Sequence, residues 1–61
     1  MTRYLIQNKE DGLYLKSFFN GFVWTLDKHE AANYRVESTA KYLVKSVPNL
    51  TQLVNIVKVE L

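Results

Sequence analysis

Catalytic chemistry in this chain would have to centre on His29, the only histidine among its 61 residues. Asp27 and Glu30 lie close to it in the sequence, and carboxylates beside a histidine are familiar acid–base partners. A nucleophile must lie within hydrogen-bond reach of its base, but no serine or cysteine is obviously paired with these residues. We therefore interpret His29 as a solvent-exposed histidine and expect the protein not to be an enzyme.

The same three residues are the candidates for holding a metal ion. Their spacing is i, i+2, i+3, whereas helical metal motifs place ligands at i and i+4. The chain has no cysteine, and both glycines are assigned to hairpin turns, which leaves no glycine-rich phosphate loop. A domain of this size is also not expected to enclose the roughly 300 Å³ of a small-molecule site. We therefore expect no metal and no cofactor.

The composition predicts one small folded domain, residues 1–61. Hydrophobic residues make up 48% of the chain and charged residues 23%, which is ordinary for a globular domain. Apolar runs are far shorter than the roughly 20 residues that span a bilayer, and the N-terminus passes directly into strand-like sequence. We therefore expect no membrane contact and no signal peptide. The lack of cysteine suits the cytoplasm, and a net charge of +2 does not by itself indicate nucleic acid.

The stretch from Leu13 to Leu26 must position most of the large side chains. It carries Asn20-Gly21, a strong signal for a two-residue type I′ hairpin turn. Such a turn sets Phe19 opposite Phe22 and Leu15 opposite Leu26, and opposed residues share a sheet face. The predicted core face therefore consists of Leu15, Ser17, Phe19, Phe22, Trp24 and Leu26.

A first strand, Arg3 to Asn8, precedes a second turn signal at Asp11-Gly12. A two-residue turn there sets Ile6 opposite Ser17 and Tyr4 opposite Phe19. Both turns thus point to the same core face, and this agreement strengthens the prediction.

One main helix is predicted from Glu37 to Val47, before Pro48. Its apolar stripe falls at i, i+3, i+4 and i+7, and consists of Ala40, Leu43, Val44 and Val47. The predicted core combines Trp24 with Leu15, Ile6, Leu43 and Val47.

The remaining segments complete the prediction. Asp27 to Asn33 is expected to form one or two helical turns, with Asn33 as a left-handed stop. Leu53 to Leu61 is predicted to be the last strand, lying parallel to the first after the helix crosses back. The predicted fold class is therefore α+β: a small, four-stranded, mostly antiparallel sheet in β-β-β-α-β order, with strand order 3-2-1-4 and one main helix on one face.

The opposite sheet face combines basic and apolar residues where a solvent-facing sheet usually carries polar ones. This outer face is predicted to hold Arg3, Leu5, Gln7, Tyr14, Lys16, Phe18, Val23, Thr25, Ile56 and Lys58. Contiguous exposed apolar residues tend to mark interfaces. Two explanations without a binding function remain open. The aromatic residues favour strand formation and do nothing more, or a loop or terminus covers the face.

A pattern of turn glycines, core aromatics and a helix start runs over nearly the whole chain. It consists of Tyr4-Leu5-Ile6-Gln7-Asn8-Lys9, Asp11-Gly12-Leu13-Tyr14-Leu15, Trp24-Thr25, Ala31, Tyr34, Ser38, Ala40 and Ile56-Val57-Lys58-Val59. This pattern resembles that of small phage and prophage proteins with a β-β-(β)-α-β fold, most of them of unknown function. Some short phage proteins inhibit host or defence enzymes stoichiometrically, anti-CRISPR proteins among them. The resemblance implies this setting and transfers no functional residue.

The sequence therefore predicts a non-enzymatic module that binds another protein, either a host protein or a second copy of itself as a homodimer. The expected binding residues are Tyr14, Phe18, Leu5, Lys16, Arg3, Val23 and Ile56. One alternative is a nucleic-acid-binding domain in which Lys16, Arg3 and Lys58 interleave with Tyr14 and Phe18 on the same face. A second alternative is a homo-oligomeric structural protein.

Overall fold

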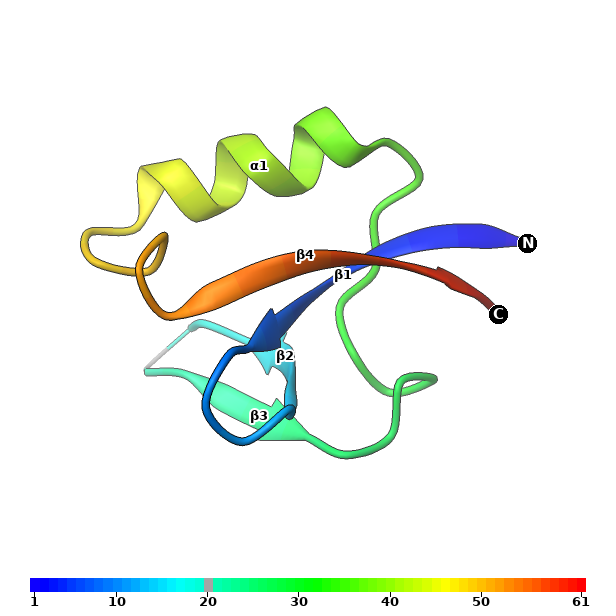
Figure 1. The fold of residues 1–61 in the computed structure, drawn as a ribbon, viewed down its shortest axis with the longest axis horizontal. Coiled ribbons are helices and arrows are strands. Elements are labelled where there is room, and N and C mark those ends of the chain that lie inside the picture. Colours follow the sequence, from blue (N-terminus) through cyan, green and yellow to red (C-terminus); the bar gives the residue numbers. More distant parts are fainter. Residues whose placement is uncertain (20) are drawn as a thin grey trace.

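The computed structural model describes residues 1–19 and 21–61. Within this part of the chain, the elements are β1 (Thr2–Asn8), β2 (Tyr14–Ser17), β3 (Val23–Thr25), α1 (Glu37–Ser46) and β4 (Val54–Glu60). The four strands form one sheet in the order β3-β2-β1-β4, and α1 packs on one of its faces (Figure 1). The predicted α+β class, element order and strand order are confirmed.

The predicted direction of β4 is wrong, because β4 runs antiparallel to β1. The segment after β3, rather than the helix, brings the chain back across the sheet to the start of β1. That segment reaches the start of β1, where Tyr34 forms an antiparallel bridge with Tyr4. From there α1 runs toward the end of β1, and β4 begins beside Asn8 and runs back (Figure 1).

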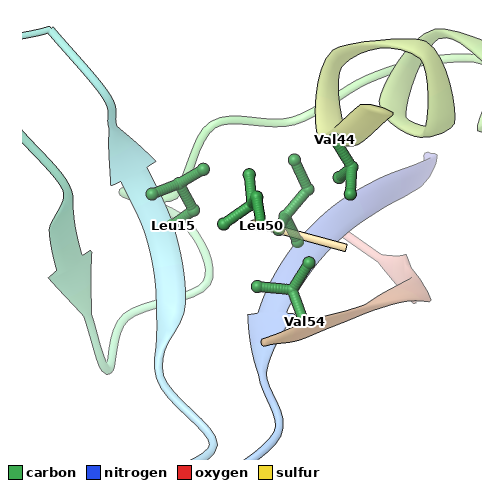
Figure 2. Packing of buried hydrophobic residues seen from close by; sticks show 5 residues of the cluster. Leu15, Val44, Leu50 and Val54 are labelled. Atoms are coloured by element: carbon green, nitrogen blue, oxygen red, sulfur yellow. The ribbon is translucent and has the colours of Figure 1, made fainter. Parts of the chain in front are cut away.

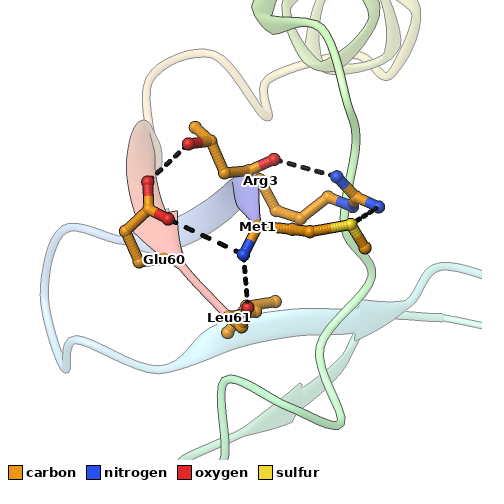
Figure 3. Close-up of polar contacts among 5 residues, drawn as sticks. Met1, Arg3, Glu60 and Leu61 are labelled. Atoms are coloured by element: carbon orange, nitrogen blue, oxygen red, sulfur yellow. Dashed lines mark hydrogen bonds and ion pairs between the residues drawn. The ribbon is translucent and has the colours of Figure 1, made fainter.

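The β1–β4 ladder is regular along both strands. Its register pairs run from Thr2 with Glu60 to Asn8 with Val54. Beyond the strand ends, the Met1 and Leu61 backbones exchange two hydrogen bonds of 2.7 and 2.8 Å (Figure 3). The ladder therefore holds the first and last residues side by side.

The other side of β1 is built differently. In the described chain a single register pair, Gln7 with Tyr14, joins β1 to β2. Residues 32–34 fill the gap beyond it: the Ala32 N–H donates to the Leu15 carbonyl at 3.0 Å, and Tyr4 and Tyr34 exchange bonds of 2.8 and 3.0 Å. This segment thus supplies the ladder partners that β1 and β2 do not give each other.

The core lies between the sheet and α1 (Figure 2). Its buried residues are Ile6, Leu15, Val44, Leu50 and Val54. The predicted core residues Trp24, Leu43 and Val47 pack against this cluster, and the helix buries Ala40 and Val44 of its predicted stripe. The sequence prediction missed Leu50, which sits in the loop after Pro48 and is fully buried.

Both predicted two-residue turns give the wrong register. At the first loop, the Asn8 N–H donates to the Leu13 carbonyl, so Lys9 to Gly12 form a four-residue loop. Gly12 has a φ of 77°, which favours glycine. At the second hairpin, Leu15 pairs with Trp24 instead of Leu26. At this pair the register is shifted by two residues, which keeps side chains on their predicted face, so Leu15 and Trp24 still share the core face. The Asn20-Gly21 turn itself includes Asn20, which lies outside the described residues.

The predicted helical turns from Asp27 to Asn33 reduce to a single turn. The Glu30 N–H donates to the Asp27 carbonyl at 3.0 Å, and the His29 N–H donates to Asp27 Oδ1 at 2.8 Å. Among the described non-glycine residues, the left-handed φ belongs to Asn49 at 68°, so Asn33 is not the predicted stop. The helix α1 begins at Glu37 as predicted and ends one residue before the predicted Val47.

Candidate functional site

The structure divides the predicted outer face. Leu5 was expected to be an exposed anchor, but its side chain is 0% exposed, so this prediction is wrong. By strand alternation Leu5 lies on the face opposite Ile6, and both side chains are buried because the chain covers both faces of β1 at this point. The alternative that other segments cover the face therefore holds at Leu5.

Ile56 is also misplaced by the sequence prediction. The β1–β4 register sets it opposite Ile6, on the face that α1 covers, where it is half-buried against the core. Lys58 lies opposite Tyr4 on the same face. Both faces of β4 carry valine or isoleucine, so the alternation of its sequence did not show which face turns inward.

Phe18 and Phe19 exchange their predicted roles. The β2–β3 pairing passes from Leu15 with Trp24 to Ser17 with Val23, so Lys16 has no matching residue and forms a bulge. An extra residue in one strand reverses the alternation beyond it. Phe18 consequently packs against the core, whereas Phe19 is 79% exposed. The other expected core residues of this hairpin, Phe22 and Leu26, are exposed as well.

Arg3 and Tyr14 keep the predicted outer face, because strand alternation places Arg3 on the face of Gln7, which pairs with Tyr14. Tyr14 is half-buried between Gln7 and Thr25, and Lys16 is exposed at the bulge. The Arg3 guanidinium folds back on the chain start: its Nη1 donates to the Thr2 carbonyl at 3.0 Å (Figure 3). Arg3 is therefore engaged at the chain end.

Two of the five residues named for the nucleic-acid alternative lie on the opposite face from the one predicted. Lys58 lies on the helix-covered face, and Phe18 is turned into the core. Arg3 and Tyr14 keep the predicted face, so binding of nucleic acid through them stays a prediction.

A different apolar surface emerges at the β2–β3 connection. We call Phe18, Phe19, Phe22, Val23 and Trp24 the aromatic hairpin end. Phe19 stacks on Phe18 with ring centroids 5.6 Å apart and planes at 10°, and Phe22 lies against Trp24 at 6.0 Å and 56°. Phe18 and Trp24 pack on the core, while Phe22 and Val23 are 42% and 46% exposed. Two anchored rings therefore support two exposed ones.

The candidate acid–base residues serve the turn before the Tyr34 segment. Asp27 accepts the His29 backbone N–H, and Glu30 Oε2 accepts from the Thr25 hydroxyl at 3.5 Å. Asp27, His29 and Glu30 are all exposed. Over residues 1–19 and 21–61, no three side chains of His, Cys, Asp or Glu gather in a metal-binding arrangement.

An open pocket of about 490 Å³ lies between α1 and the start of β4. Three lysines line it: Lys9 from the first loop, and Lys41 and Lys45 from the helix. Glu37 also lines it and pairs with Lys41 at 3.7 Å. We call this the lysine pocket. The sequence signal for it was the i, i+4 spacing of Lys41 and Lys45 on one helix side.

Two described residues have shifted pKa values, Tyr34 and Glu60, and neither lines the lysine pocket. Burial raises the pKa of the Tyr34 hydroxyl above its ordinary value. The hydrogen bond from the Thr2 hydroxyl lowers the pKa of Glu60, and the N-terminal ammonium, 3.7 Å from Glu60 Oε2, lowers it further (Figure 3). Both groups belong to structural contacts of the sheet.

Comparison with known protein families, curated proteins and solved structures finds no match to this chain. In the part of the chain that the structure describes, no helix has the length and apolar character needed to cross a membrane.

Proposed function

We propose that the protein is a non-enzymatic protein-binding module whose aromatic hairpin end inserts into an apolar pocket of a partner protein. The observation that carries this proposal is the exposure of Phe19, which is 79% accessible while stacked on the core-packed Phe18. Large exposed apolar surface is costly for a small domain and commonly marks an interface.

The arrangement of the rings favours tight contact. Burying a phenylalanine side chain contributes about 1.5–3 kcal/mol, and aromatic residues are prominent among binding hot spots. Because Phe19 and Phe22 each rest on a ring that packs on the core, less side-chain freedom is lost on binding. Lys16, exposed at the bulge, provides a charged group nearby in the sequence.

The resemblance to small phage proteins supports a host or defence protein as the partner and a cytoplasmic setting. A second copy of this chain is the other possible partner, and it would make the aromatic hairpin end self-complementary about a two-fold axis.

A matched pair of variants tests the proposal. Phe19→Asp places a charge on the hairpin end, and Tyr42→Asp places one on the 76% exposed Tyr42 of α1. We expect the wild-type protein and Tyr42→Asp to capture the same partner from a bacterial lysate, and Phe19→Asp to lose it. Light scattering during size-exclusion chromatography shows whether that partner is a second copy. Capture and oligomeric state that survive Phe19→Asp in the folded protein would overturn the proposal.

A further inference from the structure

The strand β4 forms one end of the sheet, so one of its edges has no strand beside it in the described chain. The backbone groups of β1 show which residues of β4 face that edge. Tyr4 exchanges hydrogen bonds with Tyr34, and the Asn8 N–H donates to Leu13, so these residues point away from β4. In an antiparallel ladder the direction alternates, so Leu5 and Gln7 point toward β4 and its Val57 and Asn55.

The outward groups of β4 therefore belong to Val54, Ile56, Lys58 and Glu60. Two hydrogen bonds beyond the ends of the strands follow the same alternation. The Lys9 N–H donates to the Leu53 carbonyl, and the Leu61 N–H donates to the Met1 carbonyl. Four successive N–H and C=O pairs of β4 thus face outward along the open edge, which is the pattern that an added strand would pair with.

The lysine pocket adjoins β4, which is an edge strand of the sheet. Its lining includes both Asn55 and Ile56, and neighbouring residues of a strand point to opposite faces of the sheet. Three consecutive residues of β4, Val54 to Ile56, therefore form one wall of the pocket. Its other wall is the side of α1 that carries Lys41, Val44 and Lys45.

The lining of the lysine pocket carries three lysines and one glutamate, so it favours an acidic partner. Glu37 pairs with Lys41, whereas Lys9 and Lys45 have no acidic partner within residues 1–19 and 21–61. The lysines of the pocket repel a basic strand and attract carboxylates. They also disfavour pairing of two β4 edges, because two copies would bring their lysine pockets together.

We propose that the open edge of β4 binds an extended acidic peptide of a partner protein as a fifth strand, with its carboxylates against Lys9, Lys41 and Lys45. Acidic residues at every second position of that peptide would face the helix, because strand side chains alternate. Backbone pairing with Val54, Ile56 and Lys58 supplies affinity, and the lysines supply selectivity for acidic side chains. This site is separate from the aromatic hairpin end and does not depend on the function proposed for it.

The test uses a fluorescent peptide of alternating glutamate and valine, six residues long. Its controls are the same peptide with lysine for glutamate, and one with proline for each valine, which lacks the N–H groups that a strand needs. We expect the acidic peptide to bind and to slow hydrogen exchange of the Val54, Ile56 and Lys58 amides. We expect neither control peptide to bind.

Two charge reversals locate the binding. Lys45→Glu changes the pocket, while Lys28→Glu makes the same net-charge change on the exposed turn after β3. We expect Lys45→Glu to weaken binding by about tenfold and Lys28→Glu by less than about twofold. Phe19→Asp should leave peptide binding unchanged, so failure at the hairpin end is distinguishable from failure here.

Several outcomes would overturn strand addition. Equal weakening by Lys45→Glu and Lys28→Glu would show attraction to net charge alone. Binding of a single-stranded oligonucleotide in place of the peptide, without protection of the β4 amides, would show an anion site. A concentration-dependent dimer that protects those amides without peptide would show that a second copy occupies the edge.

Discussion

The two sides of β1 are built in different ways. Toward β4 the ladder is continuous from Thr2 to Asn8, and it carries on through Met1 and Leu61. Toward β2 the described chain has a single register pair, Gln7 with Tyr14. Residues 32–34 supply the other backbone hydrogen bonds on this side. The β4 side is a regular pairing of two long strands. On the β2 side, a segment that forms only an isolated bridge completes the hydrogen bonding. We therefore expect perturbations on the two sides to act by different mechanisms.

The largest effect is expected at Leu50, which packs against the start of the β4 side. Leu50→Ala should destabilise the protein by about 2–5 kcal/mol, because its side chain is fully buried in the cluster with Val44 and Val54. Leu53→Ala is the matched control, because Leu53 is 47% exposed and should cost less than about 0.5 kcal/mol. Urea denaturation measures both, and similar losses would contradict the position of Leu50.

The bulge on the β2 side predicts unequal effects at two adjacent phenylalanines. Phe18→Ala should cost about 1–3 kcal/mol because Phe18 packs against the core, whereas Phe19→Ala should cost about 0.5 kcal/mol or less. Both changes remove the same ring stack, so the difference reports burial. Thermal melts of the two variants decide, and the reverse order would mean that the Lys16 bulge is absent.

The segment beside β1 predicts a loss of stability at alkaline pH. Burial raises the pKa of Tyr34 in the folded state above its unfolded value of about 10. The stabilisation is therefore fully present below that pH and is lost as the pH rises through the folded pKa, because the unfolded chain loses the proton first. Tyr34→Phe should remove this component of the pH dependence, and Tyr42→Phe should retain it. Denaturation at several pH values above 9 measures the difference.

The smallest effect is expected at the end of the β1–β4 ladder. The Thr2 hydroxyl lowers the pKa of the exposed Glu60, so Thr2→Val should move that pKa back toward its ordinary value. The associated stabilisation exists above the unfolded pKa and is lost as the pH falls through the lower folded pKa. NMR titration of the Glu60 carboxyl measures the shift. Thr51→Val is the control, and an unchanged Glu60 pKa in Thr2→Val would exclude the hydroxyl as the cause.

The parts of the fold that depend on local sequence patterns were predicted correctly. The helix from Glu37, its stripe through Ala40 and Val44, and the strand order followed from periodicity and turn residues. The shared face of Leu15 and Trp24 also followed, because both hairpins were displaced by an even number of residues.

The errors share a physical cause, since each depends on a long-range contact or on a single inserted residue. The Lys16 bulge reversed the faces of Phe18 and Phe19 without any mark in the sequence pattern. Leu50 is buried because its loop folds back onto the core, and Leu5 is covered on the face that appeared open. The candidate interfaces moved accordingly, from the sheet face to the aromatic hairpin end and the edge of β4.

The pairing of Met1 with Leu61 also bears on how fast the chain can fold. Its backbone contacts join residues 60 positions apart, and such separations raise the contact order and slow folding. A short turn joining Leu61 to Met1 would make β4 and β1 a local hairpin, and the new ends could open in the loop of Lys9 to Gly12. In the permuted chain, the longest ladder of the sheet forms between neighbouring segments. We therefore expect the permuted chain to fold faster than the native one.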